Sequence, residues 1–144
     1  MELATANLAA LPADWVYEYF GNAAPASVYD RAWLVMSLAQ LGRFGQAVDC
    51  EAEAIRLAEP THHAFTVGLA YWAASVLYPL QGDWIKARSR LEHGIAVLRS
   101  GNVALLLPVA ITASAWVLAE LDDEREALNR LREGEELLER HAAS

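Results

Sequence analysis

Small and large apolar residues recur along this chain with a period of 40 residues. Ala47, Ala87 and Ala127 stand 40 positions apart, and the same interval separates four further sets of small or apolar residues. These sets are Val35/Ser75/Ala115, Leu38/Tyr78/Leu118, Ala54/Gly94/Gly134 and Leu57/Val97/Leu137. A fixed period of about 20–50 residues is typical of stacked structural units, in which each unit covers the apolar side of the next.

Helix-like spacing of the apolar positions predicts helical hairpins separated by short turns. The predicted helices are 28–41 with 44–58, 63–80 with 84–99, and 104–121 with 123–141. Gly42 and Gly82 stand in the first two turns, where glycine readily adopts the left-handed conformation that ends a helix. Asp122 adopts this conformation at a greater cost, so we expect the third turn to differ in detail. Pro79 removes a backbone hydrogen bond, which predicts a kink near Ser75.

The N-terminal part is predicted to be a helical tail followed by a linker. Residues 1–11 have the composition of a helix, and Pro12 ends it because the residue before a proline is pushed out of the helical region. Asp14 is expected to cap a short helix that runs to Phe20. A linker rich in glycine, alanine and proline leads to Ser27, which is expected to cap the next helix.

The whole chain is predicted to be one all-α domain, 1–144. The segment 1–27 precedes three repeats, which span 28–58, 63–99 and 104–141. The small residues let two helices cross closely, and the large residues fill the space that remains. The Ala54/Gly94/Gly134 set is expected to permit such an approach toward the following hairpin.

These sets resemble the tetratricopeptide repeat. Its glycine, aromatic and alanine positions are matched in LGRFGQAVDCEAEAI by Gly42, Phe44, Ala47 and Ala54, and in QGDWIKARSRLEHGI by Gly82, Trp84, Ala87 and Gly94. The third copy, LDDEREALNRLREGE, keeps only Ala127 and Gly134. The usual period of this repeat is about 34 residues, and longer helices with longer turns between repeats would absorb the difference.

The resemblance implies a right-handed α–α superhelix of about three hairpins with an additional N-terminal helical segment. The longer period is similar to the extended arrays of large bacterial signalling ATPases and transcription activators. The run YFGNAAPASVYDRAWLVMSLAQLGRF is similar to the repeat region of bacterial adenylate/guanylate cyclase-type proteins. The sequence contains no GxxxxGK[ST] motif, so no ATPase or cyclase activity is transferred to this chain. The likeness suggests a fragment of a longer array.

Net charge and cysteine content exclude several binding partners and an internal disulfide. A net charge of -8 argues against binding to nucleic acid or to an anionic membrane surface. Cys50 is the only cysteine, so an internal disulfide is impossible, and we expect an inert thiol in a reducing cytoplasm. The N-terminus lacks the pattern of a signal peptide. Pro108 interrupts the apolar stretch 103–121, which favours a buried helix over a membrane span.

No arrangement of residues typical of catalysis is found, so the chain is predicted not to be an enzyme and to hold no cofactor or metal. His62 and His63 are adjacent and point about 100° apart on a helix, while His93 and His141 lie on other hairpins. The acidic turn 122–124 is interpreted as charge that complements a helix N-terminus.

The first helices of the hairpins are expected to line an apolar groove. Its predicted residues are Tyr29, Met36 and Gln40 in the first repeat, Leu69, Trp72 and Val76 in the second, and Val109, Thr112 and Trp116 in the third, with Ala32 and Glu120 in the same register. The groove offers almost no cationic group, which argues against clamping of a peptide carboxylate. Either neighbouring helices or the segment near Trp15 cover this groove, or a partner docks on it.

The predicted function is a non-catalytic protein–protein interaction scaffold in a bacterial signalling or regulatory protein. Its partner would be a protein or peptide, and a two-fold homodimer is expected because both ends of a cut array expose apolar surface. The alternative is a sensor module, in which an aromatic-lined groove holds a small effector.

Overall fold

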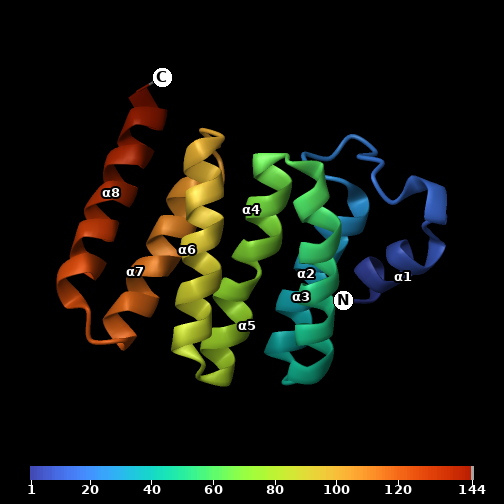
Figure 1. The fold of residues 1–144 in the computed structure, drawn as a ribbon, viewed down its shortest axis with the longest axis horizontal. Helices are drawn as coiled ribbons and strands as arrows, with labels where there is room; N and C mark the ends of the chain where they lie inside the picture. The colour runs from blue at the N-terminus through green and yellow to red at the C-terminus, as the bar shows by residue number, and fades with distance from the viewer. Residues whose placement is uncertain (144) are drawn as a thin grey trace.

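The computed structural model describes residues 1–143, which form helices and connecting loops without a β-strand in that range (Figure 1). The all-α class predicted from the sequence is therefore confirmed. The α-helices are α1 (Glu2–Ala10), α2 (Ala26–Gln40), α3 (Phe44–Ala58), α4 (Ala64–Trp72), α5 (Ala74–Gln81), α6 (Trp84–Ser100), α7 (Leu107–Glu120) and α8 (Glu124–Ala143). Two single turns of 3₁₀ helix are η1 (Ala13–Trp15) and η2 (Glu59–Thr61).

The helices lie in a row that follows the order of the chain, with α1 at one end and α8 at the other (Figure 1). Helix α2 pairs with α3, the broken helix α4–α5 pairs with α6, and α7 pairs with α8. Helix α4 packs on both helices of the first hairpin, and α7 packs chiefly on α6 of the second. Each hairpin thus covers one side of the hairpin before it.

The three turns inside the hairpins share one backbone geometry. Gly42, Gly82 and Asp122 have φ values of 75°, 76° and 61°. In each turn the next residue donates its backbone N–H to a carbonyl five positions back, at 2.9 Å: Arg43 to Leu38, Asp83 to Tyr78 and Asp123 to Leu118. The third turn, expected to differ, therefore closes with the same bond, because aspartate also tolerates the left-handed region.

The three alanines that stand 40 positions apart are all buried in the core. Ala47 and Ala87 are fully buried and Ala127 is 6% exposed. A Cβ added at Gly94 would lie 3.0 Å from the Cβ of Tyr71 in the same hairpin. One added at Gly134 would similarly approach α7, its own partner helix. These glycines therefore permit close packing within a hairpin, and the expected approach toward the following hairpin is wrong for them.

The predicted kink is present, and it falls just before Ser75. The helix is interrupted at Ala73, between α4 and α5. The N–H of Val76 donates to the carbonyl of Ala73 at 3.3 Å, a bond across three residues that tightens this turn. Pro79 cannot donate to Ser75, so the distortion extends upstream from the proline.

The N-terminal segment differs from its prediction in two places. The helix expected from Asp14 to Phe20 is wrong: only the single turn η1 forms, and Phe20 has φ 49°, which cannot continue a helix. The predicted capping role of Ser27 is also wrong, because α2 begins one residue earlier, at Ala26. The buried hydroxyl of Ser27 instead donates to the backbone carbonyl of Val16, which holds this segment against α2.

Two arginines 40 positions apart connect successive hairpins. Arg90 on α6 donates from Nε to Oε1 of Glu51 on α3 at 2.8 Å. Arg130 on α8 donates from Nη2 to Oε2 of Glu92 on α6 at 2.7 Å. Tyr78 adds a hydrogen bond from its hydroxyl to Glu51, which is only 1% exposed. Each ion pair thus joins the second helix of one hairpin to the second helix of the next.

Candidate functional site

The end of the row formed by α7 and α8 carries an open apolar groove of about 510 Å³. Its lining residues are Thr112, Ala115, Trp116 and Ala119 from α7, and Glu124, Ala127, Leu128 and Leu131 from α8. Trp116 and Leu128 are each about half exposed, and Leu131 is 43% exposed. We refer to this groove as the α7–α8 face.

The positions that correspond to Leu131 and Ala119 in the earlier hairpins are covered. Leu131 is 43% exposed, whereas Leu91 and Glu51, which lie 40 and 80 positions earlier, are 1% exposed. Ala119 is likewise exposed, whereas Ala39, 80 positions earlier, is buried. In the first two hairpins the next hairpin packs on this side. The α7–α8 face is therefore the side on which a further helix would pack.

Helix α8 carries an apolar stripe along this end. Leu128, Leu131, Glu135 and Leu138 are spaced by three, four and three residues, which places them on one side of a helix. Leu128 and Leu138 are more than half exposed. Arg132 stands beside Glu135, so the middle of the stripe carries one charge of each sign. This spacing of three and four residues is the one that paired helices of a coiled coil use.

The residues of the groove predicted from the sequence do not form one open surface. Met36 and Leu69 are buried in the core, 6% and 4% exposed, so a partner cannot contact them. Tyr29, Trp72 and Val76 are half-buried, while Gln40, Val109, Thr112 and Trp116 are exposed. Thr112 and Trp116 belong to the α7–α8 face.

The aromatic side chains at the predicted groove form two groups along the row. Trp33, which the sequence analysis missed, is 46% exposed, and its ring centroid lies 6.2 Å from those of both Tyr29 and Trp72. Trp116 instead packs on Trp84, with 5.2 Å between the ring centroids. Trp33 follows Tyr29 by four residues, so helical spacing alone could have indicated it. The predicted register assigns this place to Ala32, which is fully buried.

The N-terminal segment lies over the end of the first hairpin. Val16 packs on an apolar cluster that includes Val28 and Leu57, and the ring of Tyr19 lies 6.0 Å from that of His63. Tyr29 is the predicted groove residue that shares a pocket with this segment. The α7–α8 face lies at the opposite end of the row (Figure 1), so this segment leaves that face open.

The titratable groups near the helix ends have ordinary structural partners. His93 Nε2 lies 3.4 Å from Oε1 of Glu59, which also accepts a 2.6 Å hydrogen bond from the hydroxyl of Tyr71. Burial, together with this bond, raises the pKa of Tyr71 to about 12. Burial also raises the pKa of Cys50 to about 11, which keeps the thiol protonated at neutral pH. Over residues 1–143, no three His, Cys, Asp or Glu side chains are grouped to hold a metal ion.

Comparison of the chain with protein-family models gave no match, and comparisons with curated proteins and with solved structures also gave none. In the part of the chain that the structure describes, no helix has the length and apolar character needed to cross a membrane.

Proposed function

We propose that this chain is a non-catalytic protein–protein interaction module, a tetratricopeptide-like right-handed superhelix whose α7–α8 face binds an apolar helix. One observation carries the proposal: Leu131 is open to solvent, whereas the residues 40 and 80 positions earlier are buried beneath the next hairpin. Apolar groups that this fold covers with a helix elsewhere are here available to a helix from outside. The resemblance to bacterial repeat arrays supports a place in a signalling or regulatory protein.

The helix that occupies this face is α8 of a second copy of the chain. An antiparallel two-fold pairing of α8 brings Leu128 of each copy against Leu138 of the other, because both lie equally far from the middle of the stripe. The same pairing sets Leu131 opposite Glu135 of the second copy and brings the next residue, Arg132, close to that glutamate, twice in the dimer. The stripe thus pairs apolar residues at its two ends and brings opposite charges together near its middle, and a two-fold axis repeats each of these contacts.

Light scattering coupled to size-exclusion chromatography tests the dimer. The wild-type protein is expected at twice the monomer mass of 15.8 kDa at micromolar concentration. Replacement of Leu128 and Leu131 by glutamate should give a monomer with unchanged helix content. Ile85→Glu is the matched control, since Ile85 is 75% exposed on α6, outside the α7–α8 face. A monomeric wild-type protein would refute the second copy as occupant and leave the face to a helix of another protein.

The charges in the middle of the stripe provide a test of the orientation. Arg132→Glu places a second carboxylate close to Glu135 of the other copy, twice in the dimer, so the dimer should dissociate more readily. Adding Glu135→Arg in the same chain restores the opposite signs and should restore the dimer. If the double variant dissociates as readily as the single variant, the antiparallel pairing of α8 is wrong.

A further inference from the structure

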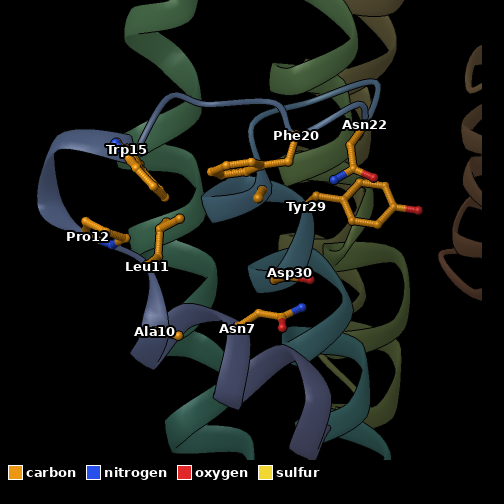
Figure 2. Close-up of a pocket in the computed structure, with 10 residues that line it drawn as sticks. Asn7, Ala10, Leu11, Pro12, Trp15, Phe20, Asn22, Tyr29 and Asp30 are labelled. Atoms are coloured by element: carbon orange, nitrogen blue, oxygen red, sulfur yellow. The ribbon is translucent and has the colours of Figure 1, made fainter.

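A second pocket, of about 430 Å³, lies at the other end of the row, between α1, the N-terminal segment and α2 (Figure 2). It is lined by Asn7, Ala10, Leu11, Pro12, Trp15, Phe20, Asn22, Ala26, Tyr29 and Asp30. Its size falls within the range of about 300–1,000 Å³ that small-molecule sites have. We refer to it as the N-terminal pocket.

Two aromatic rings form one side of the N-terminal pocket. The ring centroids of Trp15 and Phe20 lie 5.7 Å apart, with an angle of 57° between the planes, and both side chains are about half exposed. Figure 2 shows these rings on one side of the pocket and Asn7 and Asp30 on the opposite side. The two rings therefore face a polar surface across the pocket. Both rings remain accessible to a ligand, because the core does not cover them.

The backbone holds Phe20 at this place in a costly conformation. Phe20 and Gly21 have φ values of 49° and 81°, and the N–H of Asn22 donates to the carbonyl of Tyr19 at 2.9 Å to close the turn. A bulky residue in the left-handed region is uncommon and is found where the surroundings require it. This turn directs the ring of Phe20 to the pocket, where it meets Trp15.

The carboxylate of Asp30 is the charged group of the N-terminal pocket. Within residues 1–143, no hydrogen bond or ion pair reaches this carboxylate. The adjacent cation, Arg31, donates from Nη1 to the backbone carbonyl of Ser27 at 2.9 Å and forms no ion pair with Asp30. The pocket thus combines an unpaired negative charge with the faces and edges of two aromatic rings.

We infer that the N-terminal pocket binds a free organic molecule with an ammonium head group. A cation is attracted to the negative face of an aromatic ring, and most strongly to tryptophan. Asp30 supplies the opposite charge, while Leu11, Pro12 and Ala26 supply apolar contacts for the methyl or methylene groups of the ligand. The net charge of -8 adds a general attraction for cations. This site is separate from the α7–α8 face and does not depend on the proposed dimer.

Choline is a suitable probe, and 3,3-dimethyl-1-butanol is its uncharged control of the same shape. Titration followed by NMR should move the choline methyl resonance upfield, because the methyl groups lie near aromatic rings, and calorimetry should give a dissociation constant at or below millimolar. The neutral analogue should not bind. Equal binding of the two molecules would overturn the assignment, since it would show an unselective apolar pocket, and so would no binding of choline at millimolar concentration.

Matched variants identify the residues that act. Asp30→Asn should weaken choline binding roughly tenfold, because it removes the charge and keeps the shape. Asp14→Asn removes the same charge next to Trp15 but outside the pocket lining, so it should leave binding unchanged. Trp15→Leu should reduce the upfield shift, because only the ring of Phe20 then remains beside the ligand. An equal effect of both aspartate variants would show a general field effect and refute the site.

A trimethylammonium group occurs both in free small molecules and on modified lysine side chains. A peptide that carries one trimethyllysine tests which of these two ligands the pocket binds. If the pocket binds a small molecule, the peptide should bind no more tightly than choline, because the residues that line the pocket contact only the head group and its nearest carbons. Markedly tighter binding of the peptide would overturn the assignment to a small molecule. Thermal unfolding of each variant confirms that a lost signal does not come from a lost fold.

Discussion

Replacing Glu51 with glutamine tests how the first two hairpins are held together. The carboxylate of Glu51 is 1% exposed, accepts the 2.8 Å bond from Arg90, and accepts a second bond from the hydroxyl of Tyr78. Hydrogen bonds to charged groups contribute about 1.5–3 kcal/mol each. Glutamine keeps one acceptor oxygen, so one of the two hydrogen bonds is lost. In the other bond the acceptor becomes a neutral amide oxygen.

We therefore expect Glu51→Gln to lower the free energy of unfolding by about 2–3 kcal/mol. The full cost of an isolated buried charge does not apply, because the side chain of Arg90 is one-third exposed and remains partly hydrated. For a domain of this length, 1 kcal/mol corresponds to roughly 3–4 °C in the midpoint of thermal unfolding. The midpoint should therefore fall by about 6–12 °C.

Circular dichroism during heating and urea titration measures this change. The matched control is Glu53→Gln, two residues along the same helix, where an exposed ion pair joins Glu53 to Arg56. Hydrogen bonding to Arg56 lowers the pKa of Glu53, but solvent screens this pair, so no measurable change in the midpoint is expected. Equal shifts for the two variants, or no shift for Glu51→Gln, would refute the structural role of the buried carboxylate.

Three further predictions concern close packing, alkaline pH and thiol reactivity. Gly68→Ala would place a Cβ 2.3 Å from Cδ2 of Leu98 and should destabilise the protein by about 1–3 kcal/mol in urea titration; Gly45→Ala, which meets open space on α3, should stabilise it by about 0.5–1 kcal/mol. The pKa of Tyr71 is raised from 10.0 to about 12 in the folded state, so its contribution is complete below pH 10 and is lost as the pH rises toward 12. In urea titrations between pH 10 and 12, this group should lower the free energy of unfolding by about 2–3 kcal/mol. The Tyr71→Phe variant should lack this decrease, and an equal decrease in the variant would contradict the assignment. At neutral pH, Cys50 should react with iodoacetamide about a hundredfold more slowly than a free cysteine, and a comparable rate in the folded protein would show that the thiol is not protected.

The helices and their turns could be predicted because their signals are local. The predicted range 44–58 matches α3 in full, and the other long helices begin and end within a few residues of their predicted bounds. The repeating small residues and the turn residues act within one hairpin, over distances that periodicity detects. The helix predicted after Asp14 does not form, because Phe20 and Gly21 make a tight turn. The periodicity of side chains does not indicate such a turn.

The candidate sites depended on contacts between distant residues. Ser27 has a residue type that often caps a helix, but its hydroxyl binds Val16, eleven positions earlier. Glu51 is of a residue type that is typical of the solvent-exposed face of a helix. Only the pairing with Arg90, 39 positions later, allows its carboxylate to be buried. The spacing of Met36 predicts a place in an open groove, but neighbouring helices cover this side chain, which is 6% exposed.

The sequence by itself determined the helical class, the 40-residue spacing of the small residues and the place of each turn, because these follow from backbone conformation and from side-chain periodicity. The tertiary structure decided which apolar side chains remain exposed. Leu91 and Leu131 stand at equivalent positions, yet one is buried and the other open, because a hairpin follows the first of them and none follows the second within the residues described here. Periodicity identifies an apolar face, but only the arrangement of neighbouring helices shows whether that face is covered.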